Sequence, residues 1–267
     1  MKFQHFILTR FNVKMWSKDK HGAEVLTENW QKHRFDLFQN YCLPSIASQI
    51  NSNFKWIVYF DKNTDKTFLN KITNIQSNYS CFLPVFVQDS SHMFDTYKKD
   101  IINLIDSEID YLITTRLDND DCLSKNAIQK IQTSFHGAHI GIINLYCGYV
   151  YDIDKKILVK RNLSSNPFIY LKEKYLPDEI QTVWSGEHGH LSKQYNLIDI
   201  CDDNYWLQIV HKRNVINDLY RKGKVYKPIR LRNLQKKFEF KIPLEISTIN
   251  YLLELFQYYM FKIKKKY

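Results

Sequence analysis

The run TTRLDNDD, residues 114–121, places three carboxylates within four positions, at Asp118, Asp120 and Asp121. The apolar run before it predicts a buried strand, and the run after it predicts a helix with Ser124 as its N-cap. The carboxylates then lie at the carboxyl end of a strand, where open α/β sheets bind ligands. Three neighbouring anions are costly unless a cation joins them, and a divalent metal bridging two phosphates is such a cation. This chemistry favours sugar transfer from a sugar nucleotide.

Three alternatives for the acidic run fit the sequence less well. A solvated turn is the simplest, because Asp and Asn accept local backbone hydrogen bonds. An EF-hand loop needs Gly at its sixth position and Glu at its twelfth, but counting from Asp118 these are Leu123 and Gln129. A phosphatase-type nucleophile also follows a strand as Asp-x-Asp, usually with Thr or Val two places beyond the second Asp. That place holds Cys122, which disfavours a metal-dependent phosphotransferase or hydrolase without excluding it.

The composition predicts one folded catalytic domain with a small appendage. The chain has 267 residues with 44% hydrophobic and 15% aromatic content, enough for one substantial core. It has only 7 glycines, and neither GxGxxG nor GxxxxGK[ST] occurs. Any phosphate binding must therefore come from a metal, from basic side chains or from a helix N-terminus.

The net charge of +10 is concentrated at one end of the chain. Residues 211–267 hold 15 Lys and Arg against 4 Asp and Glu, and the remainder is close to neutral. This asymmetry predicts that the tail meets an anionic surface. A basic nucleic-acid-binding protein is the rival class, but no RRM, zinc-finger or helix-turn-helix pattern supports it, so we expect no nucleic-acid partner.

The five cysteines are scattered and form no CxxC pair, which argues against structural zinc and favours a reducing compartment. The apolar run at the N-terminus is too short for a signal peptide. No stretch approaches the roughly 18 apolar residues of a transmembrane helix. These observations predict a cytoplasmic location.

Strand-like and helix-like segments alternate up to residue 140, which predicts βαβ units and a mainly parallel sheet flanked by helices. The predicted strands are 3–11, 55–60, 82–87 and 110–117, and the predicted helices are 30–49, 67–76, 97–105 and 124–131. After residue 140 we expect a hairpin of 140–153 with 156–160, a long loop over 161–204, a strand at 206–211 and a helical tail from about Leu244.

Six short runs, which follow one another over most of residues 1–217, match a known family. They are HFILTRFNV (5–13), RFDLFQNYCLPSIASQ (34–49), FKWIVYFD (54–61), TTRLDNDD (114–121), NPF (166–168) and WLQIVHKRNVIN (206–217). Together they resemble the bacterial rhamnosyltransferase family, within the GT-A type of glycosyltransferase. The resemblance implies a Rossmann-like nucleotide-binding half and an acceptor half on one continuous sheet. It also implies a nucleoside-diphosphate sugar donor, with L-rhamnose carried by dTDP as one candidate.

The resemblance assigns roles to the acidic residues. Asp118 and Asp120 form the DxD element, in which one carboxylate faces the ribose and the metal and the other binds Mn²⁺ or Mg²⁺ directly. Asp121 either orients the sugar or caps the following helix. His211 matches the histidine that GT-A enzymes return to the metal from a late strand, although a structural histidine is the alternative.

Donor-binding residues are expected near the ends of other strands. Arg10 and Arg116 can fork onto phosphate or pair with the acidic cluster. Thr9 and Asn12 would lie beside the base and the ribose. Asp61 ends a strand, where a nucleotide contact and helix capping are both open.

An inverting transfer needs a base on the face opposite the leaving diphosphate. The segment VWSGEHGH, residues 183–190, lies between the DxD element and His211, where GT-A enzymes usually place that base. It offers Glu187 as the first candidate and His188 as the second, with His190 nearby. A loop for the acceptor with no catalytic member is the alternative. The string is not HExxH, so zinc chemistry of that kind is absent.

Residues 218–267 lie beyond the resemblance and form a predicted basic, amphipathic appendage. Apolar residues recur at alternating steps of three and four, at 246, 249, 253, 256, 260 and 263, and lysines follow at 262, 264, 265 and 266. Such a helix packs on its own domain or on a partner copy, so the oligomeric state stays open. Alternatively it lies on the inner membrane surface, where apolar burial and lysine attraction add. An enzyme that extends a surface polysaccharide or lipid-linked glycan would need that contact.

Overall fold

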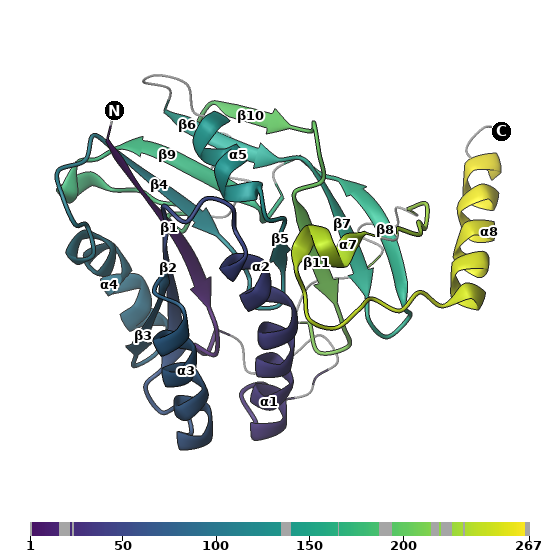
Figure 1. Ribbon diagram of the computed structural model, residues 1–267, viewed down its shortest axis with the longest axis horizontal. Helices are drawn as coiled ribbons and strands as arrows, with labels where there is room; N and C mark the ends of the chain where they lie inside the picture. Colours follow the sequence, from purple (N-terminus) through teal and green to yellow (C-terminus); the bar gives the residue numbers. More distant parts are fainter. Residues whose placement is uncertain are drawn as a thin grey trace.

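The structure, a computed structural model, describes residues 2–15, 22, 24–134, 140–164, 166–186, 194–214, 219, 226–231 and 233–264. Its strands form one sheet of seven strands and one of four. Helices lie on both faces of the larger sheet, and the last helix stands at the side of the molecule (Figure 1).

The larger sheet has the order β10-β6-β9-β4-β1-β2-β3. Its strands are β1 (Phe3–Arg10), β2 (Lys55–Asp61), β3 (Phe82–Val87), β4 (Tyr111–Arg116), β6 (Gly141–Leu145), β9 (Ile169–Lys174) and β10 (Leu197–Ile200). The first four of these strands pair in parallel, and β9 runs antiparallel to both β4 and β6. The carboxyl ends of β1, β2 and β4 therefore share one edge of the sheet. The sequence prediction of a mainly parallel α/β sheet is confirmed.

Both faces of this sheet are buried, so its central strands are continuous apolar runs instead of alternating ones. The two faces of β1 pack into two different hydrophobic cores. Ile7 on one face packs in the first core, and Phe6 and Leu8 on the other face pack with α4 (Ser90–Asn103) in the second core. The helices of the first core are α1 (Glu28–Leu37), α2 (Leu43–Ala47), α3 (Lys66–Asn78) and α5 (Ala127–Ser134).

The predicted helix over 30–49 is present, with a π-helical turn, Phe38–Cys42, between α1 and α2. Thr27 begins α1 by accepting a hydrogen bond from the backbone N–H of Trp30, which is the usual N-cap contact. Pro44 lies in the first turn of α2, where its missing N–H costs little. Asp89 similarly caps α4 through the His92 N–H, so this helix begins earlier than the predicted 97–105.

The smaller sheet has the order β5-β11-β7-β8. Its strands are β5 (Cys122–Leu123), β7 (Cys147–Asp152), β8 (Ile157–Asn162) and β11 (Trp206–Val210). A short helix, α7 (Leu234–Phe238), packs on it and buries Leu234 and Phe238. Gly148 of β7 lies against the Trp206 ring, and a Cβ there would come within 2.1 Å of that ring. Glycine therefore allows β7 and β11 to pair at this point.

Three expectations about the chain after the acidic run are wrong. The sheet is not continuous, because the predicted strand 140–153 breaks at Tyr146 into β6 of one sheet and β7 of the other. The predicted loop 161–204 contains β9, a central strand. Residues 122–123 pair as β5, so the next helix begins at Ala127 and Ser124 does not cap it; the Ser124 hydroxyl donates to Asn126 Oδ1 instead, at 2.8 Å.

A disulfide joins Cys147 at the start of β7 to Cys201 just after β10. The parallel pairing of β6 with β10 brings these two positions together, because Leu145 lies opposite Ile200. The sequence predicted free thiols, as in a reducing compartment, and this disulfide differs from that prediction. Cys42, Cys81 and Cys122 are free thiols.

The tail ends in α8 (Thr248–Lys264), which begins slightly later than predicted. A short 3-10 turn, Pro177–Glu179, completes the described elements. None of the helices in the described ranges combines the length and the apolar character that crossing a bilayer requires.

Candidate functional site

The acidic loop 118–121 lies where the two sheets meet. It leaves the carboxyl end of β4 and enters β5, which pairs antiparallel with β11 through Cys122 and Leu207. Asp121 fixes this junction, because its Oδ1 accepts a hydrogen bond from the backbone N–H of Ile209 at 3.0 Å. His211 directly follows β11, so the pairing delivers it to the same loop.

Asp120 is buried and accepts three hydrogen bonds at one oxygen. Its Oδ2 lies 2.6 Å from Arg34 Nη1, 3.1 Å from His211 Nε2 and 3.2 Å from Asn214 Nδ2. Burial would raise the pKa of Asp120, but Arg34 and His211 outweigh it, so the pKa lies below its usual value. Asp120 is therefore an ionised carboxylate with a cation already beside it.

His211 is held on both ring nitrogens. The backbone N–H of Arg213 donates to Nδ1 at 3.2 Å, so in the neutral ring Nε2 carries the proton that faces Asp120. The ring of His33, from α1, lies edge-on against His211 with 4.9 Å between centroids. The structure thus brings together two of the three predicted metal ligands.

The third predicted ligand, Asp118, lies at the rim of the site with arginines. Its side chain is 34% exposed, and its Oδ1 is 3.5 Å from Arg116 Nη2. Burial and the nearby Arg116 lower the pKa of Arg10, and Asp118 partly offsets this. Two guanidiniums at the ends of neighbouring parallel strands thus share one half-exposed carboxylate. Among the described residues, Arg116 Nε and Trp184 Nε1 are also buried donors without a hydrogen-bond partner.

Three predicted donor-binding residues are engaged within the protein. The Thr9 hydroxyl accepts a hydrogen bond from Trp56 Nε1 at 2.9 Å. Asn12 Oδ1 accepts from the Asp61 backbone N–H, and Asn12 Nδ2 donates to Thr64, each at 3.0 Å. The Asp61 carboxylate accepts from the backbone N–H of Asn63, while Asp65 caps α3. These contacts tie the ends of β1 and β2 together; their roles toward a nucleotide stay predictions.

Asp121 is only 1% exposed, and its Oδ2 is buried without a hydrogen-bond partner among the described residues. Burial, followed by the charges of Asp120 and Asp118, raises the pKa of Asp121 well above its usual value. Asp121 therefore anchors β11 through its hydrogen bond from Ile209, and its ionisation is disfavoured by its surroundings. Its hydrogen bond is with β11 and not with the following helix, so the capping alternative is wrong, while the alternative that it orients the sugar stays a prediction.

Arg34 was not predicted as a site residue, yet it makes the shortest contact to Asp120, at 2.6 Å. Arg34 Nη1 also lies 3.2 Å from Asn119 Oδ1, and Asn119 Nδ2 donates to the carbonyl oxygens of Arg10 and Phe11. One feature of the sequence could have indicated that Arg34 is buried: it lies one helical turn from both Trp30 and Phe38, on the apolar face of the helix. A buried charge requires a partner, which this pattern alone could not identify.

The predicted base candidates Glu187 and His188, and also His190, lie outside the described residues. The segment that leads to them is described as far as Gly186. Its Val183 N–H donates to the Thr114 hydroxyl of β4 at 3.0 Å, and the Trp184 ring lies 5.9 Å from the Arg10 guanidinium. The segment therefore starts at the rim that holds Arg10 and Arg116.

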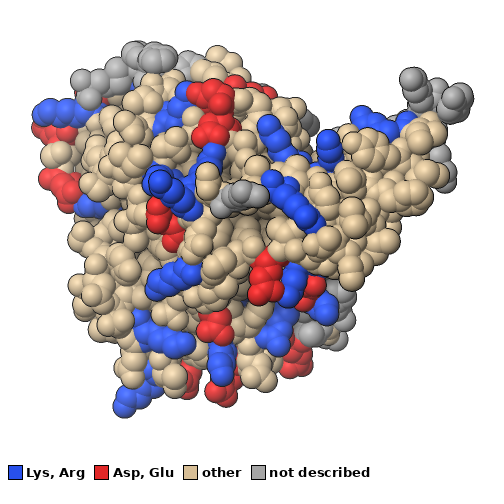
Figure 2. Space-filling model, turned by 45° about the vertical axis from the view of Figure 1, so that its right-hand side comes forward, with Lys and Arg blue, Asp and Glu red and all other residues tan. Residues whose placement is uncertain are grey.

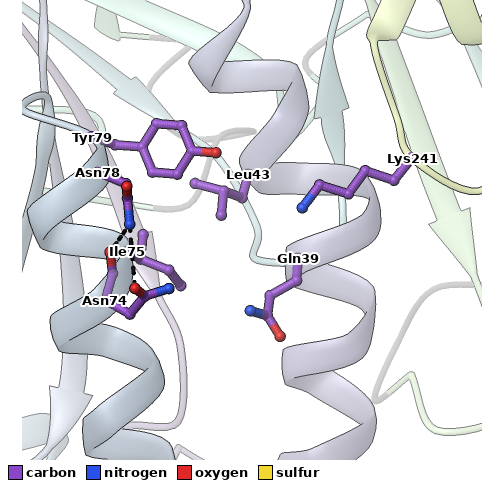
Figure 3. A pocket seen from close by; sticks show the side chains of 7 residues that line it. All are labelled: Gln39, Leu43, Asn74, Ile75, Asn78, Tyr79 and Lys241. Carbon is purple, nitrogen blue, oxygen red and sulfur yellow. Dashed lines mark hydrogen bonds between the residues drawn. The ribbon is translucent and has the colours of Figure 1, made fainter.

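A pocket of about 260 Å³ lies elsewhere, between α2 and α3 (Figure 3). It is lined by Gln39, Leu43, Asn74, Ile75, Asn78, Tyr79 and Lys241. None of the predicted site residues lines it, so it is separate from the acidic loop. Within the described ranges, no group of three His, Cys, Asp or Glu side chains is placed to hold a metal ion.

The mainly parallel sheet is flanked by helices and carries an acidic loop and two arginines at its carboxyl edge, which defines a mixed α/β fold. Residues 1–222 match the family described as "Putative rhamnosyl transferase". The chain belongs to this family of glycosyltransferases, which confirms the resemblance found in its sequence. The division at residue 217 into a catalytic domain and a C-terminal extension stays a prediction.

Solved structures give more distant similarities. Staphylococcus aureus TarS 1-349 has 12% identity and a TM-score of 0.45, covering 78% of this chain and 60% of that chain. TarS 1-349 in complex with UDP-GlcNAc has 13% identity and a TM-score of 0.45, covering 80% and 60%. A protein from Desulfovibrio desulfuricans G20 that is described as a "putative nucleotide-diphospho-sugar transferase" has 9% identity and a TM-score of 0.40, covering 96% of this chain and 97% of that chain. Among curated proteins, none matches this chain.

Proposed function

We propose that this glycosyltransferase takes its sugar from a nucleoside-diphosphate donor bound at the carboxyl edge of β1 and β4. The observation that carries the proposal is the cluster of Arg10, Arg116 and Asp118, whose formal charge is positive. A diphosphate offers acceptor oxygens to both guanidiniums, including the buried Nε of Arg116. Arginine in a partly desolvated cleft binds phosphate in a fixed orientation, which places the sugar for transfer.

A divalent ion, Mn²⁺ or Mg²⁺, belongs to this proposal, and Asp118, Asp120 and His211 are the residues that would hold it. Their carboxylate oxygens and imidazole suit these ions. When bound, the ion would neutralise the diphosphate as it leaves. These three side chains are not grouped around one ion position within the described ranges, and Asp120 and His211 hydrogen-bond each other, so they must move before an ion can bind.

The transfer that we propose is inverting, with Glu187 as the base that takes the acceptor's proton and His188 as its alternative. The sugar that we propose is L-rhamnose, which agrees with the family description. The acceptor is a growing surface polysaccharide or a lipid-linked glycan. A lipid-linked acceptor would bring the enzyme to the inner membrane surface as a peripheral protein.

Thermal unfolding with a panel of nucleotide sugars, each with and without Mn²⁺, tests the donor site. One nucleotide class should stabilise the protein, because a ligand at 100 times its Kd adds about 2.7 kcal/mol. Asp118→Asn should reduce this stabilisation, whereas Asp178→Asn, an exposed carboxylate on the 3-10 turn, should not. If no nucleotide stabilises the wild-type protein, the donor-site proposal is wrong. If a nucleotide stabilises the protein equally with and without Mn²⁺, the metal ion is wrong but the donor site stands.

A further inference from the structure

The last helix, α8, turns its apolar side chains away from the protein. Its exposed apolar residues are between 40% and 73% accessible to solvent and are Ile249, Leu252, Leu253, Phe256, Tyr259, Met260 and Ile263. A helix on a globular protein ordinarily buries such a face against the core. In Figure 1 α8 (yellow) stands beside the body at the end of a long connection. The structure therefore excludes, for these residues, the simple expectation that the helix packs on its own domain.

These seven residues form one continuous surface, which we call the apolar arc. At about 100° per residue they fall within roughly 120° of the helix circumference. The opposite side of α8 contacts the body through polar groups. Glu254 is 8% exposed and lies 3.7 Å from Lys155 Nζ, and Asn250 Nδ2 donates to the Lys155 carbonyl oxygen. Polar contacts thus hold the helix in an orientation that presents the arc outward.

The charge around the apolar arc has one sign. The single carboxylate within α8 is Glu254, which faces the body and is paired. Lys262 is exposed near the end of the helix, and Lys265 and Lys266 follow in the sequence. Figure 2 shows the arm that carries the grey C-terminal atoms as tan with blue side chains and without red in this view. An apolar strip with Lys262 beside it, and with further lysines next in the sequence, complements a surface of acyl chains and anionic headgroups.

We propose that the apolar arc of α8 is the site at which this protein binds a bilayer containing anionic phospholipid. The helix lies in the plane of the interface, with the arc among the headgroups and upper acyl chains and Lys262 at the phosphates. The proposal adds the binding element to the membrane contact included in the proposed function. It does not depend on which sugar is transferred.

A second copy of the chain is the competing occupant of the apolar arc. Residues 249, 253, 256, 260 and 263 have the spacing of a helix-pairing seam, but they span only about two heptads. Sustained coiled coils need three to four heptads and opposite charges beside the seam. The described positions beside this seam are Asn250, Leu252, Gln257 and Tyr259, which offer no ion pairs. The arc is also wider than such a seam, because Leu252 and Tyr259 extend it to one side.

Flotation of the full-length protein with vesicles tests the proposal. One vesicle preparation contains phosphatidylcholine alone, and the other also contains phosphatidylglycerol. The variant Leu253→Gln/Phe256→Gln removes the centre of the arc, at positions 56% and 65% exposed, so the fold should persist. A matched control, Ile50→Gln/Leu176→Gln, removes two exposed apolar residues elsewhere.

Wild type and control should float with the phosphatidylglycerol vesicles, and added salt should weaken this binding. The arc variant should bind at least about tenfold more weakly. Equal flotation of the arc variant and wild type would overturn the proposal, and so would equal wild-type binding to phosphatidylcholine alone. Wild-type self-association that the arc variant abolishes, without vesicle binding, would assign the arc to a second copy. Nucleotide-induced stabilisation of the arc variant should match wild type, which separates this test from that of the donor site.

Discussion

Arg34 and Asp120 form a buried ion pair that joins helix α1 to the acidic loop. Arg34 Nη1 lies 2.6 Å from Asp120 Oδ2, and the two side chains are 9% and 3% exposed. Through Asn119, the same guanidinium is linked to the carbonyl oxygens at the end of β1. Arg34 therefore acts as a positioning residue: it fixes Asp120, which in turn contacts His211.

Arg34→Gln should destabilise the protein strongly, because it leaves the buried Asp120 carboxylate without its cation. Breaking a buried pair by removing one partner typically costs about 3–5 kcal/mol. The free energy of unfolding in urea measures this loss. The variant should also weaken nucleotide binding in conditions where it remains folded, because the loop that carries Asp118 loses its anchor.

Lys55→Gln is the control for this prediction. Lys55 pairs with Asp106 at 2.5 Å, but the Asp106 side chain is 70% exposed, so the loss of stability should be small. Arg34→Lys keeps the charge without the fork of donors and should fall between the two. Equal stability of Arg34→Gln and wild type would show that the ion pair does not hold the loop.

The parts of this fold that follow local rules were predictable from the sequence. The apolar run of β2 and the acidic loop after β4 are where the sequence places them, because their patterns depend on neighbours along the chain. The approach of His211 to Asp120 was also expected, although only from the resemblance to a family. No local pattern specified that β11 would pair with β5.

The unpredicted parts involve buried charges whose partners lie elsewhere in the chain. β9 resembled a loop because it contains Lys172 and Glu173, yet both are buried. Lys172 Nζ lies 4.2 Å from the Tyr111 ring centroid, and Glu173 accepts backbone hydrogen bonds from Gln181 and Thr182. Arg34 escaped notice for the same reason. A hydrophobic pattern cannot identify such residues, because a charged residue is always taken as exposed, even when a distant residue pairs with it and allows its burial.

Arg10→Gln should weaken the binding of nucleoside diphosphates. A hydrogen bond to a charged group contributes about 1.5–3 kcal/mol, so the Kd should rise between about tenfold and a hundredfold. The Kd of the matching nucleoside monophosphate should rise less, if Arg10 contacts the diphosphate. Isothermal titration calorimetry measures both, with Lys99→Gln, an exposed lysine of α4, as the control. If the Kd rises equally for the diphosphate and the monophosphate, Arg10 does not contact the part of the diphosphate that the monophosphate lacks.

The stability of the protein should fall on acidification because of His5. Its ring is buried in β1, with Nε2 2.6 Å from Thr115 Oγ1, and burial lowers the pKa of His5 from 6.5 to about 3. Between these values the unfolded state binds a proton that the folded state does not. The stability from neutral His5 is therefore fully present above about pH 6.5 and declines toward pH 3, by up to about 1.4 kcal/mol per pH unit.

His5→Gln should flatten this dependence over the same pH range, whatever its effect on stability at neutral pH. Urea unfolding at a series of pH values gives the slope for each protein. An unchanged slope in His5→Gln would assign the acid sensitivity to another group.

Asp121→Asn should stabilise the protein at neutral pH. The raised pKa of Asp121 means that the folded protein keeps this proton to a higher pH than the unfolded chain, in which an Asp titrates near about pH 3.9. Stability is therefore lost as the pH rises from about 3.9 toward the folded-state pKa. Asparagine has the same shape and never ionises, and its carbonyl can still accept the Ile209 N–H. Urea unfolding should show the gain at pH 7 and its disappearance below about pH 4.

Donor binding by Asp121→Asn distinguishes an anchor of β11 from a residue that orients the sugar. An anchor that keeps its hydrogen bond to Ile209 leaves the Kd for the nucleotide sugar unchanged, because Asp121 is only 1% exposed. If Asp121 contacts the sugar, the variant should bind the nucleotide sugar more weakly than wild type but should bind the nucleotide alone equally well. A variant less stable than wild type at pH 7 would contradict the raised pKa of Asp121, because removing an acid whose ionisation the fold disfavours should increase stability.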